Sequence, residues 1–217
     1  EGQNLQQFAK GSSDAKEFAV SFYVKGNASA TYTCELFDAD NSRQISKTFS
    51  VTTAWTRVTL TFPADTTGAF ADDNGISLYF NIWLHAGSNF TSGTLNSTSW
   101  AANTNANRVS SSQTSFLDST SRVFYITGIQ LEVGDTATDF EHEPYSVTLS
   151  KAQRYLEVRG TDTSGWEFLA DAGQLTSATT YQLAVRFNEQ MRAAPTFSYT
   201  GNLSDIYLIR ASNIFAS

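Results

Sequence analysis

The amino-acid sequence predicts an all-β protein built around a two-sheet β-sandwich. Aromatic residues make up 13% of the 217 residues and charged residues only 16%, and the lysine- and glutamate-rich patterns of long helices are missing. Aromatic and β-branched residues favour strands, so this composition favours an all-β fold. Apolar and polar residues also alternate with a period of two in several short segments separated by turn signals, which is typical of sandwiches.

The first four predicted strands lie around residues 18–25, 31–37, 57–62 and 76–85. In each of them the even-numbered positions carry the apolar side chains, so these positions are expected to face the core. Turn residues between the segments, and Pro63 after the third, mark the strand ends. The apolar set consists of Phe18, Val20, Phe22, Val24, Tyr32, Cys34, Leu36, Val58, Leu60, Phe62, Ile76, Leu78, Phe80, Ile82 and Leu84.

A fifth strand is predicted between residues 123 and 133. Its even positions from Gly128 onward are glycine or polar, so the odd face is expected to be buried and the even face wet. Gly134-Asp135 ends the strand with turn chemistry. Pro144 then closes an acidic, extended segment, because the residue before a proline avoids the helical region. The odd positions carry Val123, Tyr125, Thr127, Ile129, Leu131 and Val133.

Between about residues 86 and 121 the alternation gives way to serine, threonine, asparagine, glycine and alanine. A connection of this length inside a compact domain is either functional or contains short strands of its own. The sequence leaves both interpretations open.

A short helix is predicted near residues 148–158, because Leu149, Ala152 and Leu156 lie at helical spacing. Thr148 or Ser146 is expected to cap its start.

Beyond this helix, alternation resumes at residues 180–187, and further strands are predicted at Phe197/Tyr199 and at residues 206–209. We therefore expect two domains with a boundary near Tyr145. Residues 1–145 form the sandwich and residues 146–217 form a smaller C-terminal β region.

Charge and cysteine content exclude several classes of function. The 14 basic and 21 acidic residues give a net charge of −7, which repels phosphate backbones, so no nucleic-acid partner is expected. No apolar run is long enough to span a bilayer, so no membrane insertion is expected either. Cys34 is the only cysteine, which rules out an intrachain disulfide, and its strand position indicates an inert core thiol.

The strongest binding candidates are four side chains on the predicted strand 76–85. Because the even positions form its core face, Tyr79, Asn81, Trp83 and His85 are expected on the opposite face. Aromatic rings beside amide and imidazole groups suit sugars, since the ring stacks on apolar C–H groups while the polar groups bind hydroxyls. Alternatively, the long connection or another protomer covers this face.

Trp100, within the long polar connection, is a further glycan-binding candidate. A tryptophan among small polar residues either anchors its loop or is displayed for recognition, and the sequence does not separate the two.

Two acidic turns offer oxygen atoms that could hold a structural Ca²⁺ ion. The first contains Asp38 and Asp40, and the second contains Asp72 and Asp73. Neither follows a complete calcium-loop pattern, and turn chemistry alone also explains both.

Signals of catalysis are weak, so no enzymatic activity and no catalytic residue are predicted. The two histidines, His85 and His142, lie far apart and outside any paired metal-ligand motif. The chain has no Gly-x-Ser-x-Gly elbow and no glycine-rich phosphate loop. A glycosidase needs two carboxylates in a cleft, and nothing in the spacing of the acidic residues selects a pair.

Several segments together resemble a known family. The run ITGIQLEVGDTATDFEHEPY at residues 126–145 is followed by AQRYLE at residues 152–157. This pattern is similar to the C-terminal part of bacteriophage tail-fibre and virion-fibre proteins that carry a carbohydrate-binding-module-like jelly roll. Supporting segments occur in family order at residues 18–25, 54–63, 82–88 and 191–196.

The resemblance implies a jelly-roll sandwich, N-terminally incomplete at residue 1, followed by a short helix and a smaller β region. It further implies a non-enzymatic structural component of a phage virion, located in a tail fibre or appendage and attaching to a host cell-surface glycan. The expected partners are two further copies of the chain in a homotrimer and other virion proteins. Two alternatives remain: a carbohydrate-binding module of a glycan-degrading enzyme, and a capsid-decorating fibre protein.

Overall fold

The computed structural model describes residues 1–158, 172–177, 181–196 and 198, and it divides into two compact units, Glu1–Glu143 and Pro144–Ser217. The division falls close to the predicted boundary at Tyr145. No helix among the described residues is long and apolar enough to cross a membrane.

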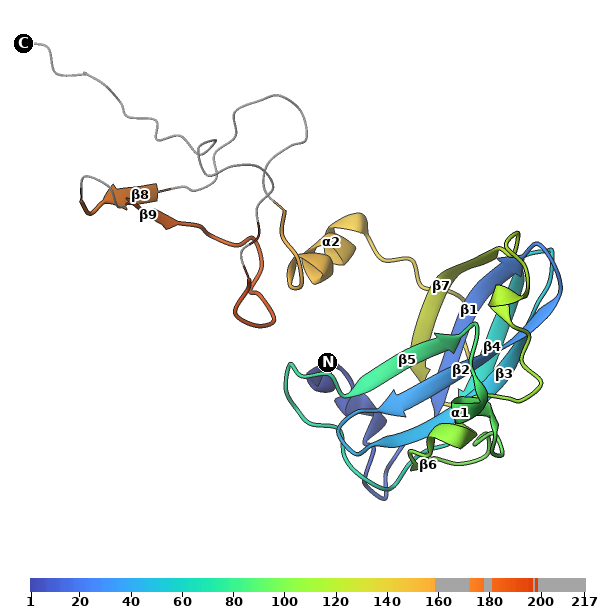
Figure 1. Ribbon diagram of the computed structural model, residues 1–217. Coiled ribbons are helices and arrows are strands. Elements are labelled where there is room, and N and C mark those ends of the chain that lie inside the picture. Colours follow the sequence, from blue (N-terminus) through green and yellow to red (C-terminus); the bar gives the residue numbers. More distant parts are fainter. Residues whose placement is uncertain (159–171, 178–180, 197, 199–217) are drawn as a thin grey trace, which may run out of the picture. The chain divides into compact units, whose positions relative to one another are not determined.

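The first unit consists of two antiparallel sheets packed face to face (Figure 1). One sheet has the strand order β4-β1-β7 and the other has the order β5-β2-β3-β6. This confirms the predicted mostly-β, two-sheet architecture. The strands are β1 (Phe18–Gly26), β2 (Ala30–Asp38), β3 (Arg43–Val51), β4 (Thr56–Phe62), β5 (Leu78–Trp83), β6 (Ala101–Ala102) and β7 (Phe124–Val133).

The core lies between the sheets and is formed largely by the predicted even-numbered positions. The ring of Phe22 from β1 lies 5.1 Å from that of Phe49 on β3, centroid to centroid, and 5.8 Å from that of Phe80 on β5. Cys34 is fully buried, and this burial raises the pKa of its thiol, as expected for an inert core cysteine. Among the even-numbered positions predicted for the first four strands, only Ile76 is exposed, and it precedes β5.

The sequence pattern does not predict β3. Its core-facing side includes Ile45 and Phe49, but Lys47 lies between them and breaks the apolar alternation. The Lys47 ammonium lies 5.7 Å from the ring centroid of Phe62, so its aliphatic stem follows the core margin.

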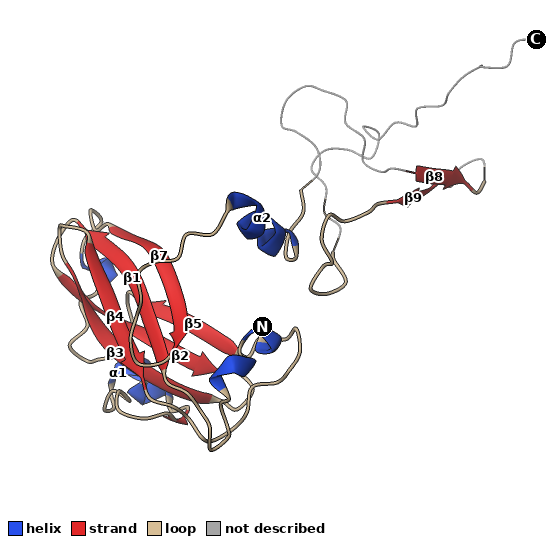
Figure 2. Ribbon diagram, turned by 180° about the vertical axis from the view of Figure 1, so that it is seen from behind, coloured by secondary structure: helices blue, strands red, loops and turns tan. Residues whose placement is uncertain are grey.

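Short helical turns occupy the connections that the sequence leaves undefined (Figure 2). Two precede β1, and three lie in the long connection between β5 and β7, which also contains β6. They are η1 (Gly2–Asn4), η2 (Gln6–Phe8), α1 (Ser88–Thr91), η3 (Asn105–Asn107) and η4 (Phe116–Asp118).

A bulge at Gly128 divides β7 into two parts. Ile126 pairs with Val24 and Leu131 pairs with Val20, with a register shift between them, and Gly128 has a φ of +59°. Left-handed glycine at a bulge is favourable because no Cβ opposes it. The extra residue reverses which parity faces the core.

This bulge corrects the prediction that the whole odd face of β7 is buried. Before the bulge the even residues Phe124 and Ile126 pack against the core, and Tyr125 is 53% exposed. After it, Leu131 pairs with a core residue and so faces the core side, but it remains 38% exposed on this edge strand.

The segment between β7 and Pro144, predicted to be extended, contains no helix or strand and folds back over the outer face of the β4-β1-β7 sheet. Thr61 Oγ1 donates to the carbonyl of Asp135 over 3.0 Å, and the amide of Glu141 donates to Gln130 Oε1 over 2.8 Å. A Cβ at Gly128 would lie 3.5 Å from the Phe140 ring, so glycine also permits this close packing.

The second unit begins with α2 (Tyr145–Gln153). The helix starts three residues before the predicted position, with Pro144 as the N-cap and no side-chain cap. The predicted caps were therefore wrong, since Ser146 and Thr148 lie inside the helix.

The other described elements of the second unit are β8 (Ala172–Leu175) and β9 (Tyr181–Ala184), which pair antiparallel. The strand predicted at residues 180–187 is confirmed by β9 in its first half. The strands predicted at Phe197/Tyr199 and at residues 206–209 lie outside the described residues.

Candidate functional site

Three of the four binding candidates predicted on the strand 76–85 lie in a row on the outer face of the β5-β2-β3-β6 sheet. Tyr79, Asn81 and Trp83 pair across β5 and β2 with Phe37, Glu35 and Thr33, respectively. The even residues of both strands face the core, so all six of these odd-numbered side chains lie on the opposite face.

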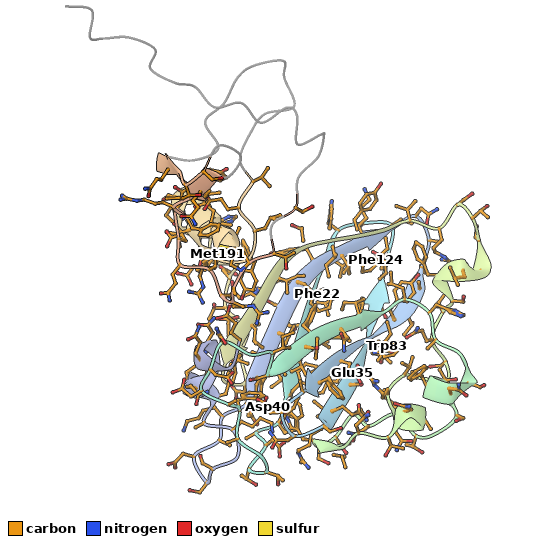
Figure 3. The ribbon with its side chains drawn as sticks, turned by 60° about the vertical axis from the view of Figure 1, so that its left-hand side comes forward. Phe22, Glu35, Asp40, Trp83, Phe124 and Met191 are labelled. Atoms are coloured by element: carbon orange, nitrogen blue, oxygen red, sulfur yellow. The ribbon has the colours of Figure 1, made fainter. Side chains whose placement is uncertain are left out.

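The centre of this face is the buried carboxylate of Glu35, which accepts four hydrogen bonds. Asn81 Nδ2 and Trp83 Nε1 each donate to Oε2 over 3.0 Å. Arg108 Nε donates to Oε1 over 2.7 Å, and its Nη2 donates to Oε2 over 2.9 Å. Figure 3 shows Trp83 and Glu35 beside each other on this face. Glu35, Asn81, Trp83 and Arg108 form what we name the Glu35 cluster.

The guanidinium of Arg108 is packed among aromatic rings as well as paired with Glu35. Its central carbon lies 5.0 Å from the centroid of the Trp83 ring, 5.1 Å from that of Phe37 and 5.8 Å from that of Phe90. A planar, weakly hydrated guanidinium is well suited to this combination of two-pronged hydrogen bonding and stacking. Arg108 directly follows η3, and Phe90 lies in α1, so both come from the long connection.

The long connection is fastened over the sheet at other points as well. Asn96 Nδ2 donates to the carbonyl of Gln44 over 2.7 Å, and the amide of Ser46 donates to the carbonyl of Asn96 over 2.8 Å. Trp83 and Asn81 are consequently part-buried beneath it. This arrangement corresponds to the alternative in which the long connection covers the Trp83 face.

Tyr79 keeps an accessible ring at the margin of the Glu35 cluster. It is 43% exposed, and its ring centroid lies 6.1 Å from that of part-buried Phe37. His85 is exposed but lies apart from the cluster contacts, with Nδ1 2.9 Å from Ser115 Oγ.

Trp100 lies in the core. It is 6% exposed, its indole N–H donates to the carbonyl of Pro63 over 2.9 Å, and its ring centroid lies 5.5 Å from that of Phe18. Trp100 therefore anchors its loop in the core and is not displayed for recognition, the two roles that the sequence left open. Its burial removes it from any surface that a glycan could reach.

The four acidic residues proposed for Ca²⁺ are not brought together as ligands. Asp38 is buried and pairs with Lys10 over 2.5 Å. Asp40 Oδ2 accepts from the amide of Ala71, and Asp73 Oδ1 from that of Gly75. Asp72 is exposed. Within the described residues, no group of three or more histidine, cysteine or acidic side chains is arranged to hold a metal ion.

Sequence reasoning missed the central residues Glu35 and Arg108. The available signal was a carboxylate in the middle of a strand between the core residues Cys34 and Leu36, because a charge there requires a partner. That partner lies 73 residues away in the sequence, so no local pattern identifies it.

Comparisons with protein-family models, with curated proteins and with solved structures find no match for this chain.

Proposed function

We propose that the chain is a non-enzymatic, structural and adhesive component of a phage virion, part of a tail fibre or appendage that recognises a host-surface glycan. The observation that carries the recognition role is the Tyr79 margin of the Glu35 cluster, an accessible aromatic ring beside a rigidly held polar framework. The virion assignment rests on the resemblance of the sequence segments. The finer assignment of the sandwich as a jelly roll belongs to the same proposal.

The chemistry of the surface around Tyr79, at the margin of the Glu35 cluster, suits a sugar. The exposed Tyr79 ring offers a face for apolar C–H groups, and its hydroxyl can exchange hydrogen bonds with sugar hydroxyls. The neighbouring strand β2 holds Phe37 beside it, and the guanidinium of Arg108 packs against the Phe37 ring. A surface fixed before binding loses little conformational entropy when the ligand arrives.

The environment of Glu35 supports a non-enzymatic role. Its carboxylate is fully buried, and both oxygens accept hydrogen bonds from Asn81, Trp83 or Arg108. A general acid or base must reach a substrate proton. Glu35 instead fastens the long connection to the sheet.

Exposed apolar side chains on the first unit support assembly with further copies of the chain. Tyr125 on β7 and Trp55 before β4 are both about half exposed, and their ring centroids lie 6.3 Å apart. Apolar patches of this kind mark interaction surfaces. A homotrimer bound to other virion proteins is the assembly we propose.

Glycan binding by Tyr79→Ala, compared with Tyr145→Ala, tests the recognition role. Both replace an exposed tyrosine, but only Tyr79 belongs to the proposed surface, and Tyr145 in α2 takes no part in the surface proposed for assembly. We expect Tyr79→Ala to lose binding to a glycan array and to host cells, and Tyr145→Ala to retain it, with both proteins folded. Equal binding by the two variants would refute the site.

Light scattering of the 23.8 kDa chain after size exclusion tests the assembly. A trimer supports the fibre proposal. A monomer that still binds glycan through Tyr79 would instead favour the carbohydrate-binding module of a glycan-degrading enzyme. Virion fractionation separates a fibre from a capsid-decorating protein.

A further inference from the structure

A second buried charge in the first unit has no role in the proposed glycan surface. Lys10 follows η2, and its side chain is completely buried. Its ammonium lies 5.2 Å from the ring centroid of Phe70 and 5.5 Å from that of Trp100. An ammonium removed from water in this way needs full compensation by nearby oxygens.

Four oxygen atoms surround the Lys10 ammonium. Asp38 Oδ2 lies 2.5 Å from Nζ, the Gly68 carbonyl 2.7 Å, the Thr67 carbonyl 2.9 Å and Asp65 Oδ2 3.1 Å. Two carboxylates and two backbone carbonyls are the hard oxygen donors that calcium also prefers. We name these four oxygens the oxygen cage.

Groups other than Lys10 hold the two carboxylates of the cage in place. Arg43 donates to both oxygens of Asp65 over 2.8 and 2.9 Å. The backbone amide and the side-chain amide of Asn41 donate to Asp38.

Backbone geometry fixes the carbonyl side of the cage. Gly68 has a φ of +73°, and a Cβ there would lie 2.4 Å from the Asn41 side chain, so only glycine fits. Residues 38–68 therefore supply all four oxygens of the cage, and contacts besides those of Lys10 orient them.

We propose that the oxygen cage is a cation site whose resident cation is the Lys10 ammonium, and that removal of this ammonium converts it into a site for Ca²⁺. The two aspartates carry two negative charges and Arg43 supplies one positive charge, so a single ammonium neutralises the group. The native fold consequently needs no metal ion at this position.

The charge balance also sets the expected affinity of the emptied cage. Ca²⁺ brings one more positive charge than the ammonium, and it finds four protein oxygens where it prefers six to eight ligands, so water must complete its shell. We therefore expect a dissociation constant of about 10⁻⁴–10⁻³ M, the weak end of protein calcium sites.

The test compares Lys10→Ala with Lys10→Met in the full chain. Both remove the charge equally, but alanine leaves room for an ion while methionine fills it. At about 10 mM Ca²⁺, we expect the folded-to-unfolded ratio of Lys10→Ala to rise about 10- to 100-fold over its value in EDTA. The ratios of Lys10→Met and of the wild-type protein should stay unchanged. Thermal unfolding followed by circular dichroism measures all three.

Terbium luminescence provides a second readout of the same site. Trp100 lies beside the Lys10 ammonium, so a Tb³⁺ ion in the emptied cage would be sensitised by excitation of this indole. We expect emission from Lys10→Ala that is lost when Ca²⁺ displaces the Tb³⁺, and only background from Lys10→Met, which carries the same net charge.

Each outcome of these measurements either supports or overturns the proposed calcium site. A Lys10→Ala protein that is unfolded in EDTA and folds on addition of Ca²⁺ supports it as well as a shift in midpoint does. A protein that stays unfolded at about 10 mM Ca²⁺, equal responses of the two variants, or stabilisation of the wild type by Ca²⁺ overturns it. Tyr79→Ala leaves the cage intact, so the cage proposal stands or falls independently of glycan recognition.

Discussion

The Lys10 and Glu35 sites each compensate a buried charge with surrounding polar groups, and the two charges have opposite signs. In the first, a buried cation is surrounded by four oxygen atoms, and in the second, a buried anion accepts four N–H groups. Each site fastens a segment outside the long strands to β2 of the β5-β2-β3-β6 sheet. Asp38 at the end of β2 holds the N-terminal segment, and Glu35 within β2 holds the long connection.

The two sites differ in how completely their cation is withdrawn from water. Both partners of the Lys10–Asp38 pair are fully buried, whereas Arg108 keeps 16% of its side chain exposed. Lys10 also lies between two buried carboxylates, those of Asp38 and Asp65, whereas Arg108 pairs with Glu35 alone, so loss of the lysine leaves more buried negative charge uncompensated. The comparison therefore predicts unequal costs for equivalent substitutions.

The largest effect is expected from Lys10→Met. It leaves Asp38 buried without its cation, which costs about 3–5 kcal/mol of unfolding free energy. Chemical denaturation measures the loss. The control is Lys10→Met/Asp38→Asn, which removes the orphaned charge and should recover part of it. A double variant less stable than Lys10→Met would contradict the pairing.

Arg108→Met should cost less, about 2–3 kcal/mol, because Glu35 loses its charged donors but keeps those of Asn81 and Trp83. Arg108→Lys is the matched control. It restores the charge without the planar fork, so it should recover only part of the loss. Full recovery by lysine would show that charge alone holds the connection, and denaturant midpoints decide between the two.

Acidification should weaken the Lys10 site through Asp65. Burial raises the pKa of its carboxyl, but hydrogen bonds from Arg43 and Lys10 outweigh this, and the folded-state pKa lies below the ordinary value. Its stabilising contribution is complete above the unfolded pKa of about 3.9 and is lost as the pH falls through the lower folded value. Asp65→Asn should therefore show a shallower loss of unfolding free energy in acid than the wild type. Identical acid profiles would exclude this role.

The smallest effect is expected from Trp83→Phe, which keeps a ring against Arg108 but removes the N–H donated to Glu35. Loss of this one hydrogen bond to a charged acceptor should cost about 1–2 kcal/mol. Tyr79→Phe is the control, since the Tyr79 hydroxyl takes no part in the cluster, and it should be nearly neutral in thermal unfolding. Equal losses would contradict the assignment.

Local alternation in the sequence predicts β1, β2, β4 and β5, because a strand with one buried face repeats every two residues. It fails where a single residue changes that period. Lys47 interrupts the apolar alternation of β3, because it places a charge among core positions. The extra residue at the Gly128 bulge exchanges the core-facing and outward-facing positions of β7. Neither event leaves a signal that alternation alone detects.

The sequence predicts which face of β5 carries the candidate site, but not which of its aromatic rings are accessible. Parity places Tyr79, Asn81 and Trp83 together on the outer side of β5, and the structure agrees with that placement. Which rings stay accessible depends on partners distant in the sequence, such as Arg108 over the Trp83 ring and the Pro63 carbonyl that accepts the indole N–H of Trp100. Such pairings are fixed by tertiary packing, so the sequence could not choose between a displayed and an anchored tryptophan.

The position of Cys34 gives the protein an intrinsic reporter of its own opening. This sole thiol lies in the middle of β2, directly before Glu35, and is completely buried. An alkylating reagent reacts with the thiolate, which forms readily only when β2 separates from the core. When reclosure outpaces labelling, the mass-spectrometric labelling rate reads the opening equilibrium directly. Any variant that keeps Cys34 can thus be ranked in mixtures, at low concentration and without denaturant.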